Sequence, residues 1–177
     1  MGNFKEDIAR VEAFVFDVDG VFTDGSIVPL PDGDFLRTYY AKDGYSITYA
    51  VRQGYKIFII TGGRGEIIRR RFEHLGATEF HNNVSDKISV LRDIISRYNL
   101  NPENLIYMGD DIPDLECMKE VGIPVCPSDA ASEIIESARY VSEYVGGRGC
   151  VRDIVEQVLR AQGKWALHSK GVNVVSA

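Results

Sequence analysis

The sequence has 177 residues, 45% of them apolar and 26% charged, which suits one globular domain with a single core. Its formal net charge of -6 offers no general attraction to nucleic acid or to anionic membranes, and we expect neither as a partner. The sequence shows no apolar run long enough to cross a bilayer and no signal-peptide core. Its three cysteines lack metal-binding spacing, and together these features predict a cytoplasmic protein.

Strands and helices are predicted to alternate along the chain. A buried strand over 11–16 is followed by a β-hairpin with strands at 26–30 and 35–40, joined by an Asp-Gly turn. The later elements are helices over 44–54, 64–75, 115–121, 130–137 and 150–161, a helix after Ser85 as its cap, and strands over 55–61, 78–81, 105–108, 123–125 and 139–141. This alternation predicts an α/β fold, a Rossmann-like parallel sheet sandwiched by helices.

The domain organisation is predicted to be simple. Residues 1–164 form one domain with the hairpin inserted at about 21–41, and residues 165–177 form a C-terminal tail with little periodicity.

Polar residues stand where several of the predicted strands end. Asp17 ends the first strand, Thr61 ends the second, and Asp110 follows a later one. Ligands of parallel α/β sheets bind beyond the carboxyl ends of the strands. We therefore expect these three residues to gather at one rim of the sheet.

Five carboxylates are predicted to share that rim: Asp17, Asp19, Asp110, Asp111 and Asp114. One like-charge pair at ~4 Å costs roughly 4 kcal/mol at an effective dielectric constant near 20. A divalent cation relieves this repulsion, and an all-oxygen site for phosphate chemistry favours Mg²⁺.

The residue types at the rim suit the hydrolysis of a phosphate monoester. Asp17 can attack phosphorus as a covalent nucleophile, and Asp19 can protonate the leaving oxygen and later activate water. Thr61 supplies a hydroxyl donor and Lys87 a positive charge for the phosphoryl oxygens.

These motifs, in this order, resemble those of the haloacid dehalogenase superfamily. They are Asp17-Val18-Asp19-Gly20, then Thr61-Gly62, then Lys87, then Gly109-Asp110-Asp111 with Asp114. The chain has no large cap domain between them. It is similar to the small capless branch that acts on 3-deoxy-D-manno-octulosonate 8-phosphate, to which Lys42-Asp43-Gly44 and Gly146-Gly147-Arg148-Gly149 also correspond.

The resemblance implies an enzyme of lipopolysaccharide biosynthesis that works through an aspartyl-phosphate. It implies Mg²⁺ held by Asp17, the main-chain carbonyl of Asp19, and Asp110, with Asp111 and Asp114 orienting the ligands or water. It also implies a homotetramer in which hairpins from several subunits pack together and neighbouring subunits help to close the site.

Several residues are candidates for binding a phosphorylated sugar acid: Gly62, Gly63, Arg64, Lys42 and Arg148. Several relatives place a charged residue directly after Thr-Gly, where this chain has Gly63. A glycine leaves room there but supplies no charge. Arg64, one position later, is the expected partner of the substrate carboxylate.

Other functions remain open from the sequence. The nearest alternative is a phosphatase for a nine-carbon keto-sugar acid 9-phosphate, which would need the same chemistry. A receiver domain of phospho-signalling also gathers acidic residues, a Thr and a Lys, but its phosphorylated Asp ends an internal strand, whereas Asp17 ends the first. A scaffold acting through oligomerisation is a further alternative, which the intact motif set opposes. Phosphatase turnover on a panel of sugar-acid phosphates would separate these functions.

Overall fold

The computed structural model describes residues 3–165, and its centre is a six-stranded sheet. The strands are all parallel and lie in the order β5-β4-β1-β6-β7-β8. Their bounds are β1 Ala13–Phe16, β4 Lys56–Ile60, β5 Glu79–His81, β6 Leu105–Met108, β7 Ile123–Cys126 and β8 Tyr140–Val141. The predicted α/β class and parallel sheet are confirmed.

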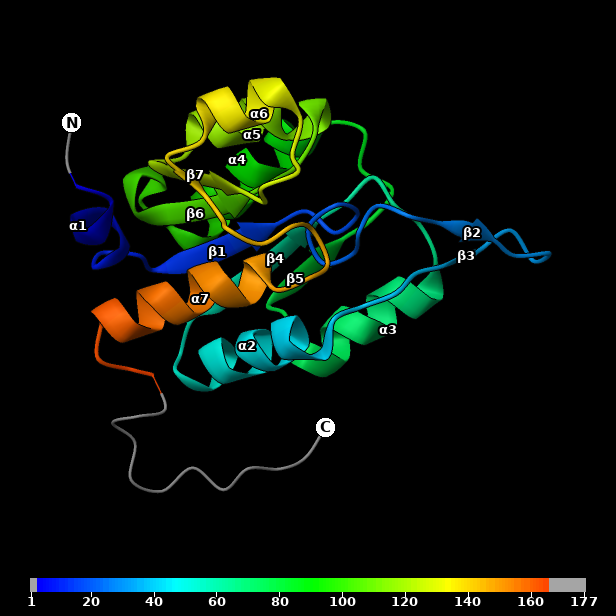
Figure 1. Ribbon diagram of the computed structural model, residues 1–177, viewed down its shortest axis with the longest axis horizontal. Coiled ribbons are helices and arrows are strands. Elements are labelled where there is room, and N and C mark those ends of the chain that lie inside the picture. Colours follow the sequence, from blue (N-terminus) through cyan, green and yellow to red (C-terminus); the bar gives the residue numbers. More distant parts are fainter. Residues whose placement is uncertain (1–2, 166–177) are drawn as a thin grey trace.

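Helices cover both faces of the sheet (Figure 1). The layer that shares its apolar core with Phe14 and Phe16 contains α1 (Phe4–Ile8), α2 (Ala41–Arg52), α3 (Glu66–Leu75) and α7 (Cys150–Ala161). The opposite layer contains α4 (Lys87–Tyr98), α5 (Leu115–Glu120) and α6 (Ser132–Ser137). Short 3-10 turns lie at Pro102–Asn104 and Ile112–Asp114.

The central strand β1 shows why the sheet needs two helical layers. Phe14 and Phe16 belong to one core cluster, whereas Ala13 and Val15 belong to the other, and all four are fully buried. Successive side chains of a strand point to opposite faces, so a continuous apolar run places apolar groups on both. Covering both faces with helices buries them all.

The inserted hairpin lies outside these layers and projects from the domain (Figure 1). Its antiparallel strands are β2 (Val28–Pro29) and β3 (Phe35–Leu36), joined through Gly33 at φ +85°. A positive φ favours glycine, which is why the Asp-Gly pair was a good turn signal. Ile27, Val28 and Leu36 are about half exposed, so the hairpin presents an apolar surface.

Several local details differ from the sequence prediction. The hairpin strands cover only Val28–Pro29 and Phe35–Leu36, and not 26–30 and 35–40, and α3 and α6 each begin two residues later than expected. Helix α2 begins three residues earlier than expected, and the short helix α1 was not predicted. The cap of α4 is Asp86 and not Ser85, because the Asp86 side chain accepts a hydrogen bond from the Ser89 amide at 3.2 Å.

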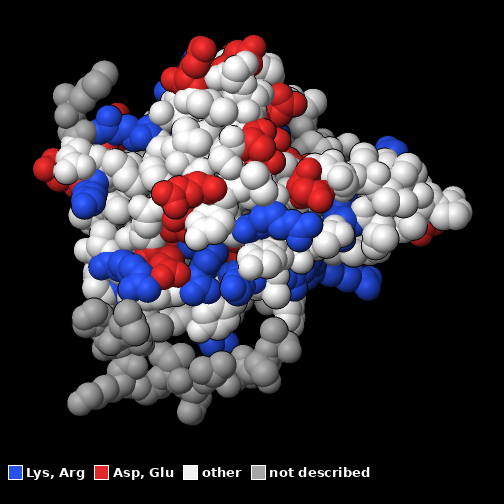
Figure 2. Space-filling model, viewed as in Figure 1, with Lys and Arg blue, Asp and Glu red and all other residues white. Residues whose placement is uncertain are grey.

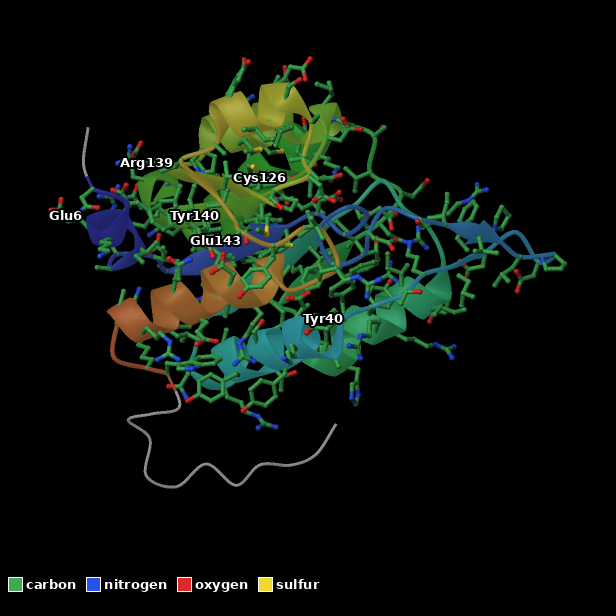
Figure 3. All side chains as sticks on the ribbon, in the orientation of Figure 1. Glu6, Tyr40, Cys126, Arg139, Tyr140 and Glu143 are labelled. Carbon is green, nitrogen blue, oxygen red and sulfur yellow. The ribbon has the colours of Figure 1, made fainter. Side chains whose placement is uncertain are left out.

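The chain ends of the described region pack onto the domain. The ring of Phe4 in α1 stacks on the ring of Tyr140, and the two ring centroids are 4.6 Å apart. Figure 3 shows Tyr140 and Arg139 beside that helix. Trp165 is buried and lies 5.0 Å from the ring of Tyr49. The predicted tail otherwise lies outside the described residues, so its boundary at 165 stays a prediction. Within 3–165, every helix is too short or too polar to span a membrane.

The order of the strands creates one topological switch point. From β1 the chain passes to β4 and β5 on one side, and then crosses to β6, β7 and β8 on the other. The loops after β1 and β6 therefore diverge, leaving a crevice at the carboxyl ends of these neighbours. Asp17 and Asp110 follow these two strands.

Candidate active site

A cavity of about 470 Å³ opens at this rim of the sheet. Its lining combines the loops after β1, β4, β5 and β6 with the start of α4. The lining residues are Asp17, Asp19, Gly25, Thr61, Gly62, Gly63, Val84, Ser85, Lys87, Asp110, Asp111, Pro113 and Asp114. The expected gathering of strand-end residues is thus present in the structure, and we call this cavity the carboxylate pocket.

Lys87 lies at the centre of the charges in the carboxylate pocket. Its Nζ lies 2.9 Å from Oδ1 of Asp17 and 2.8 Å from Oδ1 of Asp114, and all three side chains are buried. Tyr107 donates its hydroxyl to the same Asp114 oxygen at 2.7 Å. The backbone amide of Asp110 donates to Asp114 Oδ2 at 3.2 Å. Asp114 therefore has protein donors on both carboxylate oxygens.

The electrostatics of the pocket reflect burial and crowding of like charges. Burial and the Asp114 carboxylate raise the pKa of Asp17 well above its ordinary value, although Lys87 opposes the shift. The same two causes raise the pKa of Asp110 to about 7. Burial lowers the pKa of Lys87, but Asp17 and Asp114 outweigh that effect and the net shift is upward. Lys87 alone does not neutralise the cluster.

The carboxylates are spaced so that one cation could bind them. One oxygen each from Asp17, Asp110 and Asp114 lies within 4.8 Å of the others. A hard divalent ion takes such oxygen ligands and would offset the repulsion that raises the carboxylate pKa values. The donor set therefore fits Mg²⁺, with Asp17 and Asp110 more available than Asp114, whose oxygens are already hydrogen-bonded.

The carboxylate of Asp19 is held by the hairpin side of the pocket. Arg37, directly after β3, donates from Nε to Oδ1 at 2.7 Å and from Nη2 to Oδ2 at 3.0 Å. Thr23 adds its hydroxyl at 3.4 Å from Oδ1. The Arg37 side chain is only 4% exposed. This two-pronged ion pair is the main feature of the site that the sequence prediction missed.

The loop after β4 is shaped by backbone contacts around Thr61. The Thr61 amide donates to the His81 carbonyl at 2.9 Å, and its hydroxyl oxygen accepts from the Gly63 amide at 3.0 Å. A Cβ on Gly63 would lie 2.8 Å from Arg37 Nη2 and 3.0 Å from Asp19 Oδ2. The space left by the glycine is therefore filled by the Arg37–Asp19 pair.

The Gly146-Gly147-Arg148-Gly149 loop packs against the loop that follows β1. A Cβ on Gly146 would lie 2.0 Å from the carbonyl oxygen of Gly20, so only a glycine fits there. The amide of Gly147 donates to the Val21 carbonyl at 2.9 Å, and Cys150 Sγ lies 3.2 Å from the same oxygen. The glycines in this motif thus have a packing role next to Asp17-Val18-Asp19-Gly20.

Lys42 and Arg148 do not line the carboxylate pocket. They line a second cavity of about 350 Å³, together with Tyr40, Tyr144, Gly149, Arg152, Asp153, Glu156, Gln157 and Arg160. We call it the α2–α7 cavity. Figure 2 shows basic side chains in a band across this face, over α7, and Figure 3 places Tyr40 at the start of α2. Arg64 is exposed and lies over the Phe35 ring of the hairpin, 5.8 Å from its centroid.

Two contributors to the site gave weaker sequence signals. Tyr107 lies within the apolar run of β6, where it reads as core packing, yet its hydroxyl fixes Asp114. Arg37 directly follows the return strand β3 of the hairpin, and no periodicity in the sequence predicts the direction in which this hairpin points. An isolated arginine among aromatic residues was the only available signal.

Comparisons with known proteins support the same type of site. Residues 64–151 match the family model described as haloacid dehalogenase-like hydrolase. The 3-deoxy-D-manno-octulosonate 8-phosphate phosphatase KdsC of Escherichia coli K12 is 36% identical over 155 residues, which cover 88% of this chain and 82% of the relative.

Solved structures of similar proteins have the same fold. The 3-deoxy-D-manno-octulosonate 8-phosphate phosphatase of Yersinia pestis superimposes with a TM-score of 0.87 at 33% identity, covering 90% of this chain and 86% of that one. The phosphatase of Moraxella catarrhalis, solved with a magnesium ion, a phosphate ion and a KDO molecule, gives a TM-score of 0.86 at 27% identity. That match covers 90% of this chain and 91% of the other.

Proposed function

The chain belongs to the haloacid dehalogenase-like hydrolase family, and from that premise we propose that it hydrolyses 3-deoxy-D-manno-octulosonate 8-phosphate to the free sugar acid and phosphate. The observation that carries this proposal is the buried arrangement of Asp17 against Lys87 at the switch point of the sheet. The likeness to phosphatases of that substrate over most of the chain supports the choice of substrate.

The residues of the carboxylate pocket suggest a two-step displacement. Asp17 attacks phosphorus, and the bond from phosphorus to the sugar oxygen breaks as the aspartyl-phosphate forms. Asp19 gives a proton to the departing oxygen and then takes one from the water that hydrolyses the intermediate. Lys87 and the Thr61 hydroxyl stabilise the negative charge on the phosphoryl oxygens.

We further propose that Mg²⁺ is the cofactor. It would be bound by Asp17, the main-chain carbonyl of Asp19, and Asp110, with Asp111 and Asp114 in supporting positions. When bound, it supplies positive charge to the nucleophile and the phosphoryl group. The carboxylate spacing and the raised pKa values of Asp17 and Asp110 support this assignment. Chelation should abolish turnover and added Mg²⁺ should restore it, whereas full activity without metal would contradict the assignment.

The substrate assignment is tested by steady-state kinetics on eight- and nine-carbon sugar-acid phosphates. We expect the highest kcat/KM on 3-deoxy-D-manno-octulosonate 8-phosphate. A higher kcat/KM on the nine-carbon 9-phosphate would instead make that compound the substrate, and the chemical mechanism would be the same. A stable phospho-protein without turnover of any phosphate monoester would instead favour a receiver-like role.

The proposed substrate contacts lie outside the reacting centre. Gly62 and Gly63 line the carboxylate pocket, and Arg64 follows them at the hairpin side. Lys42 and Arg148 line the α2–α7 cavity, so we propose that they act on the distal part of the sugar acid or along its approach.

We propose that the enzyme is a cytoplasmic homotetramer. The half-exposed Ile27, Val28 and Leu36 on the hairpin support self-association, because apolar groups on a projecting element favour burial against a partner. All three cysteines are free and buried, as suits a reducing compartment. Deleting residues 29–35 should yield a smaller species in solution, and an unchanged tetramer would exclude the hairpin as its main contact.

A further inference from the structure

We propose that Arg37 is a positioning residue, through which the hairpin sets the orientation of the acid–base carboxylate Asp19. The inference rests on the proposed function, because it assigns to Asp19 the proton transfer to and from the substrate. It adds a role for the hairpin within its own subunit, separate from any contact between subunits.

The ion pair between Arg37 and Asp19 holds the Asp19 carboxylate in one orientation. Arg37 approaches Asp19 with two nitrogens, at 2.7 and 3.0 Å, so each carboxylate oxygen has its own donor. A bidentate contact sets the plane of a carboxylate as well as its position, which a single point charge does not do. Together with the Thr23 hydroxyl, it leaves Asp19 little freedom to rotate.

Arg37 is itself held in place by its surroundings. Its side chain is 4% exposed, and its guanidinium carbon lies 5.8 Å from the centroid of the Phe35 ring. Arg64 lies at the same distance from that ring. Cation–ring contacts of this kind favour a fixed guanidinium. The orientation of Asp19 therefore depends on where the hairpin places Phe35 and Arg37.

Gly63 gives independent support for this arrangement. A methyl group at that position would lie 2.8 Å from Arg37 Nη2, 3.0 Å from Asp19 Oδ2 and 3.2 Å from Thr61 Oγ1. The backbone of the Thr61 loop thus leaves room for the ion pair and for no side chain. The substitution Gly63→Ala should push the flexible end of Arg37 away from Asp19 while retaining both charged residues.

The leaving group of the substrate provides a selective test. A sugar oxygen leaves as an alcohol and needs a proton, whereas p-nitrophenolate leaves as a stable anion without one. The parameter kcat/KM reports the steps up to formation of the aspartyl-phosphate and excludes its hydrolysis. Mispositioning Asp19 should therefore lower kcat/KM for the sugar-acid phosphate and spare p-nitrophenyl phosphate.

The experiment compares Arg37→Met, Arg37→Lys and Gly63→Ala on both substrates. For Arg37→Met we expect kcat/KM to fall roughly 10- to 100-fold on the sugar-acid phosphate and less than about threefold on p-nitrophenyl phosphate. Gly63→Ala should also lower kcat/KM more on the sugar-acid phosphate than on p-nitrophenyl phosphate, with a smaller loss on both substrates because its methyl group crowds the Thr61 hydroxyl. Arg37→Lys should recover part of the loss, because it restores one donor. Arg70→Met, which removes an exposed arginine on α3, is the matched control and should change neither value.

Two further readouts separate positioning from a general structural effect. In an Asp19→Asn background, Arg37→Met should cause no additional loss on the sugar-acid phosphate. A crystal structure of Arg37→Met should show the Asp19 carboxylate displaced or in more than one rotamer. An equal loss on both substrates, or an Asp19 that keeps its place, would overturn the proposal.

Failure of the proposed function would look different. Wild-type enzyme would then reject the eight-carbon phosphate, and the leaving-group comparison would use whichever alkyl phosphate it hydrolyses. The position of Asp19 in the Arg37→Met crystal structure needs no substrate, so it decides the proposal even if no alkyl phosphate is turned over.

Discussion

The carboxylate pocket and the α2–α7 cavity differ in how their charged side chains are buried and paired. In the pocket, Lys87 is buried and bridges two carboxylates from different loops, so each charge depends on distant parts of the chain. In the cavity, Arg152 and Arg160 pair with Glu156 one turn away on the same helix, and Lys42 and Arg148 are exposed. Buried charges between elements are costly to lose, whereas partly exposed pairs within one helix contribute less. This difference supports our proposal that the chemistry takes place in the carboxylate pocket and that the α2–α7 cavity has an accessory role.

The largest effect is expected at the nucleophile. Asp17→Asn keeps the shape of the side chain but removes the attacking carboxylate, so turnover should fall by about 10⁴-fold or more. Steady-state kinetics and thermal unfolding, measured together, would test this. Near-normal activity in a folded variant would contradict covalent catalysis by Asp17. It would also contradict the proposal that the chemistry takes place in the carboxylate pocket and not in the α2–α7 cavity.

The next largest effect is expected at Lys87. Lys87→Met should lower kcat by roughly 10²- to 10³-fold, because a preorganised charge on the phosphoryl group is lost. It also leaves two buried carboxylates without their counter-charge, which should cost roughly 3 kcal/mol in the free energy of unfolding. Activity and denaturant unfolding would be measured on the same preparation. A variant that loses activity at unchanged stability would show that the ion pairs of Lys87 do little for the fold.

Smaller effects are expected for the exposed cations of the cavity. Lys42→Gln and Arg148→Gln should each raise KM about two- to fivefold at constant kcat, because an exposed charge contributes on the order of 1 kcal/mol to binding. Substrate-saturation curves would separate the two parameters. A loss in kcat as large as that expected for Lys87→Met would mean that the α2–α7 cavity takes part in catalysis, as the carboxylate pocket does.

The smallest effect is expected for a pair within α7. Arg160→Gln breaks the contact with Glu156, but Arg152 still pairs with that carboxylate. The free energy of unfolding should change by less than about 0.5 kcal/mol, with kcat unchanged. Chemical denaturation and initial rates provide the check, and a larger loss of stability would mean that the surface charges act as a network.

The sequence was most informative where a polar residue follows a buried apolar strand. Asp17, Thr61 and Asp110 could be placed at one rim because parallel strands share a direction, and a buried apolar run marks each strand. Neighbouring residues with equal propensity were harder to separate. Ser85 and Asp86 are both good helix caps, and only the orientation of the backbone decides that Asp86 accepts the bond.

Interactions between distant segments could not be predicted from pattern. Arg37 meets Asp19 because the hairpin folds back toward the rim, and nothing in the alternation of its strands encodes that direction. The position of Lys42 after the hairpin and of Arg148 before a helix, together with motif likeness, predicts that both contact the substrate. The structure adds that they line a different cavity from Asp17.

The contact between Gly146-Gly147-Arg148-Gly149 and the nucleophile loop has a consequence for the order of folding. Gly147 and Cys150 bind the carbonyl of Val21, across more than 120 residues of chain. A ribosome releases the N-terminal motif long before these partners exist, and contacts so distant in sequence form late because loop closure opposes them. Asp17 therefore acquires its final surroundings only after residues 147–150 have left the ribosome. A nascent chain that ends before residue 147 would carry Asp17 without the contacts that hold its loop, so we expect catalytic competence only after the Gly146-Gly147-Arg148-Gly149 loop has been synthesised and packed.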